Sequence, residues 1–377
     1  MGREEILLLT TRSSTARLPL PIVVKIKPRA QYTHEMNIID SPSNAGRSAG
    51  PATVTPIGTG RHWLARLPPG LFAIVLGLLG LASAWRRLAG FKLEHTDLVA
   101  TAILNVATGL LELLLLLLIF KLWRFRDEVR RDFLHPVHGA MLSVVPLVVM
   151  LAIALWTPLL AQPSAFALPI VLVALAVEAV FVWRVVSQLS TGAMPADMVT
   201  PALYIPVVGS GLIGAMTLQA MGLHGFAVLL FGMGLSGWAL LEARVLNRLF
   251  AGPLPPPFRP TSGVEMAPAA IATLAASVLW PTLPADVILI GLGVACGPMI
   301  GVLVRWRWWS DVPFSLGFWS FSFPVAALAA VIVEAVARGG WPVQVAFVAV
   351  LLATAVIAFL TVRTLILLVR GRLIPPG

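Results

Sequence analysis

The chain is dominated by apolar runs that are each long enough to cross a membrane as a helix. About 20 apolar residues in an α-helix span a bilayer core of about 30 Å. The runs are too long for barrel strands and lack alternation, so helices must satisfy the backbone hydrogen bonds within the membrane. The sequence therefore predicts an all-α polytopic membrane protein. Its ten predicted spans cover residues 67–86, 98–120, 136–157, 166–187, 201–222, 225–249, 262–280, 285–304, 313–336 and 342–369.

Composition and charge agree with this class of protein. Of the 377 residues, 58% are hydrophobic and 12% are charged, which is too apolar for a soluble domain of this length. Basic residues gather at span ends on the side of the N-terminus, and the positive-inside rule then predicts a cell (inner) membrane protein with both termini in the cytoplasm. The net charge of +10 is mostly this asymmetry, so we do not expect nucleic-acid binding.

Composition divides the chain into two regions. Residues 1–60 are rich in Ser, Thr, Pro, Gly and Arg, and we expect a disordered N-terminal arm there, followed by a ten-helix transport domain over residues 61–377. Cys296 is the only cysteine, which excludes a disulfide framework and a thiolate metal cluster.

Sequence motifs for enzymes and cofactors are weak. His135 and His138 have no third ligand nearby, and "GMGLSG" (232–237) lies in an apolar span without the strand that a dinucleotide site requires. No catalytic motif is present. We therefore expect no metal, no cofactor and no enzymatic activity.

Prolines reveal an internal repeat. Pro146, Pro206, Pro268 and Pro324 lie inside the third, fifth, seventh and ninth spans, 60, 62 and 56 residues apart. Such a period is close to the length of one helical hairpin with its loops. The pattern favours five hairpins in which the odd-numbered helix is kinked, with the kinked helices around a common axis.

The intramembrane acidic residues follow the same division. Glu112, Glu178 and Glu242 lie on even-numbered spans, whereas the interiors of the odd-numbered spans carry none. A charge in the membrane is costly and usually has a partner or a task. We favour a structural role, in which these glutamates tie outer helices to their neighbours or to interfacial arginines such as Arg184. A lumen without carboxylates would not repel anions.

The stretch "FWSFSFP" (318–324) opens the ninth span. At helical spacing Phe323 lies on the same face as Ala326, Ala327 and Ala330, so it is the one large side chain on a narrow face. Two readings stay open at this point. The alanine face packs closely against another helix, or it borders a channel that the ring of Phe323 closes.

Six segments then carry a family resemblance. The chain resembles the tellurite-resistance/dicarboxylate transporter family, which includes bacterial TehA, malic acid permeases and guard-cell slow anion channels. The similar segments, in order, are "LPPGLFAIVLGLLGLASAW" (67–85), "HPVHGAMLSVVP" (135–146), "PALYIPVVGSG" (201–211), "LFGMGLSGWALLEARVLNRL" (230–249), "FRPTSGVEMAPA" (258–269) and "GFWSFSFP" (317–324).

The resemblance implies a quasi-fivefold ring of five helical hairpins around a central pore, assembled as a homotrimer. The gating phenylalanine of the family falls on Phe323. Two departures are Val75, where relatives carry a proline, so that Gly77 and Gly80 would have to supply any bend, and Pro324, where relatives carry a small residue.

These expectations combine into a membrane anion channel or channel-like transporter for small inorganic or organic anions, gated by Phe323. Arg130, Arg131 and Arg259 would attract anions at the cytoplasmic mouth. The alternative is a proton-coupled carrier of four-carbon dicarboxylates, or an effluxer of tellurite or sulfite. The expected pore-lining residues are Ser143, Pro146, Pro206, Ser210, Gly214, Thr217, Ala267, Pro268, Ser320 and Ala327.

Overall fold

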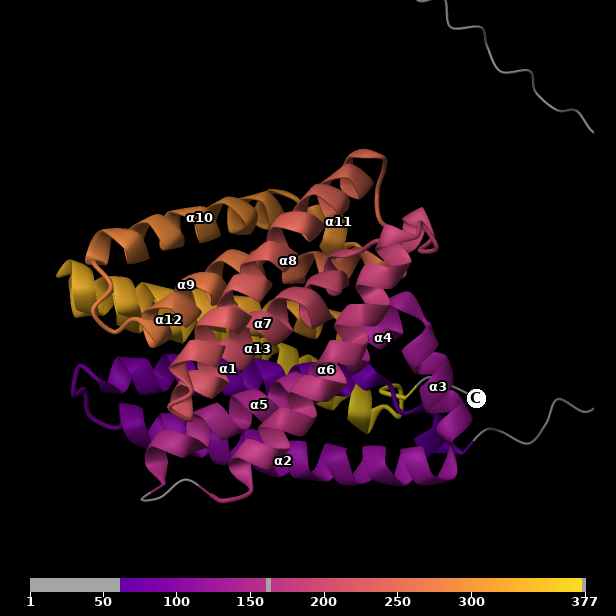
Figure 1. The fold of residues 1–377 in the computed structure, drawn as a ribbon, viewed down its shortest axis with the longest axis horizontal. Coiled ribbons are helices and arrows are strands. Elements are labelled where there is room, and N and C mark those ends of the chain that lie inside the picture. The colour runs from indigo at the N-terminus through magenta and orange to yellow at the C-terminus, as the bar shows by residue number, and fades with distance from the viewer. Residues whose placement is uncertain (1–61, 161–163, 375–377) are drawn as a thin grey trace, which may run out of the picture. The chain divides into compact units, whose positions relative to one another are not determined.

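The computed structural model describes residues 62–160 and 164–374, which belong to one unit of the chain, Gly58–Gly377. The predicted arm lies outside the described residues. All regular structure in the described ranges is helical (Figure 1), and ten helices are long and apolar enough to cross a membrane, which confirms the predicted number. The spans are Pro69–Ala89, Thr96–Arg124, Pro136–Leu159, Ala167–Ser190, Pro201–Ala220, His224–Phe250, Pro256–Leu279, Ala285–Val304, Leu316–Gly339 and Val343–Val369.

The odd-numbered spans are the inner ones. Between 56% and 94% of each odd-numbered span is buried within the protein, against 22% to 28% of each even-numbered span. The inner helices are α1 (Phe72–Ala89), α4 (Pro136–Leu142) with α5 (Val144–Trp156), α7 (Ser210–Ala220), α9 (Ala267–Leu279) and α12 (Ser322–Gly339). The outer helices are α2 (Thr96–Arg124), α6 (Ala167–Ser190), α8 (His224–Phe250), α10 (Ala285–Val304) and α13 (Val343–Val369).

Contacts between the inner helices close a cycle. Helix α1 packs on α5, α5 on α7, α7 on α9, α9 on α12, and α12 again on α1. Each outer helix packs on the inner helix of its own hairpin and on the next inner helix, so that α2 contacts both α1 and α5, and α13 contacts both α12 and α1. In Figure 1, α2 and α10 lie at opposite edges of the helix assembly. This arrangement is consistent with the predicted quasi-fivefold ring.

The inner spans are interrupted near their prolines. A proline has no N–H to donate to the carbonyl four residues earlier, which loosens the preceding turn. Pro206 lies in a π-helix, Ile205–Gly209, that precedes α7. Pro268 and Pro324 stand in the first turns of α9 and α12 and follow the 3₁₀ segments Pro256–Met266 and Leu316–Phe321. The break between α4 and α5 falls at Ser143, shortly before Pro146.

The first span differs from the other inner spans. Helix α1 continues from Phe72 to Ala89 after a short 3₁₀ turn, Pro69–Leu71, and contains Val75 in its buried face. Gly77 does not mark a break in this helix. A Cβ atom at Gly77 would lie 2.5 Å from Cβ of Ser322, so the glycine lets α1 approach α12 closely.

The glycines of "GMGLSG" also serve helix packing. Gly234 of α8 meets Gly211 of α7 so closely that a Cβ atom at Gly211 would lie 2.5 Å from the Cα atom of Gly234. Gly237 packs on Val207 in the same way, whereas Gly232 faces open space. The motif is thus the crossing point of the α7–α8 hairpin.

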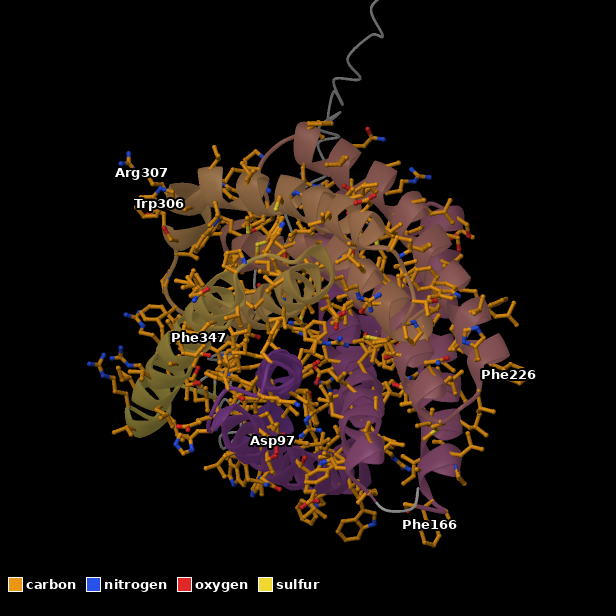
Figure 2. All side chains as sticks on the ribbon, turned by 90° about the vertical axis from the view of Figure 1, so that its left-hand side faces the viewer. Asp97, Phe166, Phe226, Trp306, Arg307 and Phe347 are labelled. Atoms are coloured by element: carbon orange, nitrogen blue, oxygen red, sulfur yellow. The ribbon has the colours of Figure 1, made fainter. Side chains whose placement is uncertain are left out.

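Two short helices lie between spans and are absent from the sequence prediction. Helix α3 (Arg126–Leu134) follows the second span, and α11 (Trp306–Ser310) follows the eighth. Figure 2 shows large apolar side chains such as Phe166, Phe226 and Trp306 pointing outward from the helix assembly. Such exposed rings are expected on a surface that faces lipid.

Candidate functional site

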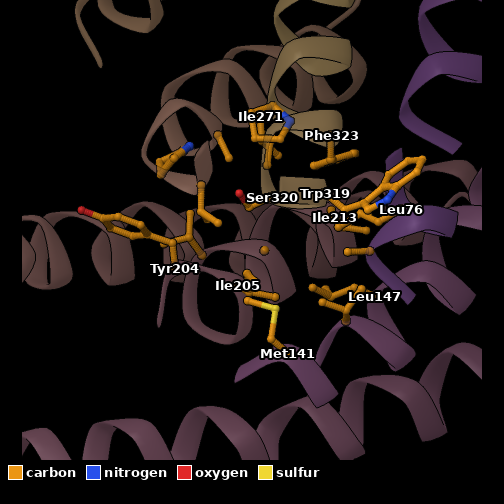
Figure 3. Close-up of a pocket in the computed structure, with 18 of the residues that line it drawn as sticks. Leu76, Met141, Leu147, Tyr204, Ile205, Ile213, Ile271, Trp319, Ser320 and Phe323 are labelled. Atoms are coloured by element: carbon orange, nitrogen blue, oxygen red, sulfur yellow. The ribbon is translucent and has the colours of Figure 1, made fainter. Parts of the chain in front are cut away.

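A cavity lies between the five inner spans, and its lining residues fall within the first two thirds of each span. Its volume is about 60 Å³, which leaves room for only a few water molecules. Every inner span contributes side chains to it, at the three- and four-residue spacing of one helix face. The lining residues are Ala73, Leu76, Met141, Val144, Leu147, Tyr204, Ile205, Val208, Gly209, Ile213, Val264, Ala267, Pro268, Ile271, Leu316, Gly317, Trp319, Ser320, Phe323 and Pro324 (Figure 3).

Each inner span places one bulky apolar side chain at the end of its stretch of the cavity lining. In four spans it is the last residue that lines the cavity, and in the ninth only Pro324 follows it. None of the five is more than 8% exposed. We call this set the apolar collar. Its members are Leu76, Leu147, Ile213, Ile271 and Phe323.

Phe323 is the aromatic member of the collar, and its ring rests against α1. A Cβ atom at Gly80 would lie 2.8 Å from Cδ2 of Phe323 and 3.2 Å from Cβ of Ala326. The ring can occupy this position because Gly80 has no side chain. The alanine face therefore packs on α1 at Ala326, and of the residues on that face only Phe323 also borders the cavity.

The polar groups around the cavity form hydrogen bonds with residues that do not line it. The Tyr204 hydroxyl donates to Glu242 of α8 at 2.7 Å, and Trp319 Nε1 donates to Oγ1 of Thr364 at 2.8 Å. The Ser320 hydroxyl donates to the carbonyl of Pro260. No Asp, Glu, Lys, Arg or His is among the residues that line the cavity. The cavity is therefore apolar and free of carboxylates.

Only some of the predicted pore residues line this cavity. Phe323, Ala267, Pro268 and Ser320 do, whereas seven others lie outside its lining. These seven are Ser143, Pro146, Pro206, Ser210, Gly214, Thr217 and Ala327.

Three of these seven have identifiable packing or hydrogen-bond partners in the helix assembly. The Ser143 hydroxyl donates to the carbonyl of Ala140 at 2.8 Å, and the Thr217 hydroxyl contacts the carbonyls of Ile213 and Met150. A Cβ atom at Gly214 would meet Leu175 and Leu230 of the outer helices, each at 3.1 Å. Small and hydroxyl-bearing residues thus serve helix packing as well as the cavity.

The intramembrane glutamates have three different environments. Glu242 ties α8 to the inner helices, because it accepts hydrogen bonds from Tyr204 and from Trp238, and this confirms the predicted structural role for that residue. Glu112 is exposed on α2. Glu178 is 1% exposed, and neither carboxyl oxygen has a hydrogen-bond partner among the described residues.

The basic residues predicted at the mouth lie outside the cavity. Arg130 and Arg131 are exposed on α3, and Arg131 pairs with Glu128 at 3.0 Å. Arg259 is half-buried, with its guanidinium over the ring of Trp308 at 5.3 Å. All three can act on an approaching anion only through the longer-range field.

A polar cluster fixes α3 at the end of the helix assembly where the odd-numbered spans begin. Lys121 is buried and donates to Asp132 and to the carbonyl of Leu67, each at 2.9 Å. Burial alone would raise the pKa of Asp132, but hydrogen bonds from His138 and Lys121 outweigh it and hold that pKa below its usual value. Within the described ranges, no group of three or more His, Cys, Asp or Glu side chains is placed to hold a metal ion.

His135 directly precedes the third span. Its Nδ1 accepts hydrogen bonds from the backbone N–H groups of Val137 and His138, each at 3.2 Å, and so caps α4. Partial burial, together with the neighbouring His138, lowers the pKa of His135. The histidine pair therefore has a local structural role, in which the unprotonated His135 ring is the capping form.

Ten spanning helices, with five buried ones around a carboxylate-free cavity, define a multi-pass membrane protein of the transport class. The sequence profile of the SLAC1 family, described as voltage-dependent anion channels, matches residues 66–370. The chain belongs to this family, which confirms the resemblance given above.

Three relatives illustrate the family. The chain is 28% identical to the tellurite resistance protein TehA homolog of Haemophilus influenzae over 283 residues, covering 70% of this chain and 79% of that protein. It is 25% identical to the S-type anion channel SLAH2 and 26% identical to the guard cell S-type anion channel SLAC1, both of Arabidopsis thaliana, over 72% and 81% of this chain. The chain spans about half the length of these two plant relatives, 53% and 56% respectively.

Proposed function

We propose that the protein is an anion channel or channel-like transporter of the cell membrane, in which small anions cross through the axis of the inner helices. The observation that carries this proposal is the carboxylate-free cavity that ends at one apolar side chain from each inner span. An anion in this cavity meets no fixed negative side chain. The two plant relatives, both named S-type anion channels, point to the same function.

The collar is the proposed gate. An apolar constriction with no room for water blocks an ion because the ion would have to leave its hydration shell without replacement ligands. Phe323 is the proposed moving part, since a flat ring can swing aside by rotation about its side-chain bonds. The other four members are aliphatic and lie in the walls between helices. The arginines near the membrane surface at which the odd-numbered spans begin, including Arg130, Arg131 and Arg259, would raise the anion concentration at the mouth of the channel. Salt would screen this effect.

Anion flux in reconstituted liposomes tests the gate. Phe323→Ala removes the ring, and we expect chloride or nitrate flux to rise by about tenfold or more, equal to a barrier lowered by about 1.4 kcal/mol. Phe231→Ala is the matched control, because this ring packs on Trp280 at 5.3 Å and does not line the cavity. Unchanged flux in a folded Phe323→Ala variant would contradict the gate.

Assembly as a homotrimer is part of the proposal, and the surface of α2 supports self-association. Asn105, Gly109 and Glu112 are exposed and follow one another at spacings of four and three residues, so they share one outward face. Polar side chains at membrane depth need partners, and the small residue between them allows another helix to approach closely. A second copy of the chain would supply that helix.

A proton-coupled carrier is a second candidate, and Glu178 is the observation that favours it. Its carboxyl group is buried without a hydrogen-bond partner among the described residues, although α6 is an outer helix and Glu178 does not line the cavity. Flux of malate, sulfite or tellurite measured together with internal pH separates the two candidates. A coupled carrier would show a matching pH change that Glu178→Gln abolishes, whereas a channel would show neither.

A further inference from the structure

A second large hollow lies on the outside of the helix assembly. This lateral groove has a volume of about 900 Å³ and runs between α10 and α13, with the outer face of α12 as its floor. Its walls include Cys296 and Met299 of α10 and Val348 and Leu352 of α13. Apart from Arg363 and Ser310, its lining is apolar or aromatic. An open apolar groove of this size on a membrane protein faces lipid or another protein.

The groove is longer than one leaflet of the bilayer. Its floor runs from Pro324 to Ile332 of α12, and its α13 wall runs from Val345 to Arg363. At a rise of about 1.5 Å per residue the α13 wall is about 27 Å long, close to the hydrocarbon thickness of about 30 Å. An acyl chain that enters from the membrane surface therefore fits within the half of the groove that lies nearest Arg363.

A single cation stands at the surface end of the groove. Arg363 of α13 lies near the C-terminal end of its helix, with its guanidinium 5.2 Å from the ring centre of Phe314 and 6.0 Å from that of Phe359. Within the described parts of the chain, no salt bridge joins Arg363 to a carboxylate. Its charge is therefore available to a phosphate at headgroup depth.

We propose that the lateral groove is a binding site for an anionic phospholipid. This lipid comes from the membrane leaflet at which the odd-numbered spans begin. One acyl chain lies along α12 between α10 and α13, and the headgroup phosphate pairs with Arg363. Pro324 lines both this groove and the central cavity, so the bound chain touches the wall that carries Phe323. The bound acyl chain thus packs against α12 on the side away from the central cavity and stabilises the position of Phe323.

Photo-crosslinking tests the site. The full chain is reconstituted in phosphatidylcholine vesicles that contain a minor fraction of phosphatidylglycerol with a photoactivatable group in one acyl chain. We expect the cross-links to fall on groove residues such as Cys296, Met299 and Leu352. The same probe on a phosphatidylcholine headgroup should give a lower yield, because it offers no net negative charge to Arg363.

Two pairs of variants sharpen the test. Arg363→Gln should lower the phosphatidylglycerol yield in the groove about fivefold, the worth of one arginine near an anionic surface, while Arg370→Gln near the end of the same helix should not. Ala355→Trp should lower it by filling the groove, whereas Ala358→Trp, exposed on α13 outside the groove, should not. Size-exclusion elution in detergent reports whether each variant is folded.

Two outcomes would overturn the proposal. Cross-links spread evenly over α2, α6 and α8, or a yield that neither Arg363→Gln nor Ala355→Trp changes, would mean that the groove is ordinary lipid-facing surface. Cross-linking of a second copy to the groove residues would make it a subunit interface. The lipid site does not depend on transport, so groove cross-links in vesicles without anion flux would contradict the proposed function and leave the lipid site intact.

Discussion

The five collar side chains differ in shape, and the difference gives them different parts in the proposed gate. Leu76, Leu147, Ile213 and Ile271 are aliphatic, whereas Phe323 presents a flat ring beside Gly80. Phe323 is predictable from the sequence because it is the one large side chain on a face of alanines. The other four are not, since leucine and isoleucine at helical spacing are the ordinary content of any transmembrane face.

Polarity at the collar can be tested with two replacement side chains of similar volume, threonine and valine. We expect Ile271→Thr to raise anion flux, by less than Phe323→Ala does, because a hydroxyl group offers water a partner inside the constriction. Ile271→Val is the control, since it also shortens the side chain and stays apolar. Chloride efflux from liposomes is the measurement, and equal flux in the two variants would show that room rather than hydration controls passage.

The cap at His135 predicts a pH effect on stability. Since the pKa of folded His135 is lowered, its contribution is fully present above the unfolded value of about 6.5 and is lost as pH falls through the folded pKa. Protonation removes the Nδ1 acceptor that caps α4, and a cap is worth about 1 kcal/mol. Asparagine caps a helix without titrating in this range.

Thermal unfolding in detergent checks this prediction. His135→Asn should match the parent protein near pH 8 and lose less stability than it does near pH 5. Identical pH profiles for the two proteins would mean that other groups dominate acid destabilisation. Asp132 acts in the same direction at lower pH, because its pKa is also below the ordinary value.

At the scale of the helix, prolines and glycines have different structural roles. The four repeated prolines stand at or just after departures from α-helix, such as the π-helix Ile205–Gly209, and this much follows from their missing N–H. The glycines are harder to interpret from sequence, because their effect depends on which neighbour lies opposite. Gly77 and Gly80 were candidates for a bend, but in the structure they accommodate Ser322 and Phe323 of α12.

The crossing of α7 and α8 predicts a local stability effect. Gly211→Ala would place a Cβ atom against the backbone of Gly234, which cannot move without separating the hairpin, and we expect a cost of about 1–3 kcal/mol. Gly232→Ala on α8 is the matched control, because no atom lies within 4 Å of its added Cβ. Thermal unfolding of both variants is the measurement, and equal melting temperatures would contradict the packing argument.

At the scale of the whole molecule, the sequence predicts the number of spans, their order and their division into inner and outer helices, because apolar length and proline period are properties of the chain itself. Helix α3 is not predictable in this way, since six of its nine residues are charged and it lies between two spans. The collar and the lateral groove also escape sequence reading. Both form where several helices meet, and no single helix carries their signal.

The exposed polar face of α2 predicts how the protein assembles. Glu112→Leu should weaken self-association in mild detergent and shift the proposed trimer toward smaller species, because it would remove a polar contact between copies. Leu122→Ala on the same helix serves as a control for altered apolar surface, since Leu122 is also exposed but lies about a quarter turn around the helix from Glu112. The mass measured by light scattering reports the state, and an unchanged mass for Glu112→Leu would place the interface elsewhere.

The collar lies part-way along the inner helices, with Leu76 and Phe323 each about two turns from the start of its span. A membrane voltage falls across the insulating layer between the two aqueous phases, and each elementary charge that crosses it gains or loses about 2.3 kcal/mol per 100 mV. In the proposed channel, an anion that has entered the cavity and reached the collar has already crossed part of the membrane voltage. Its passage therefore responds to voltage even when no charged side chain moves.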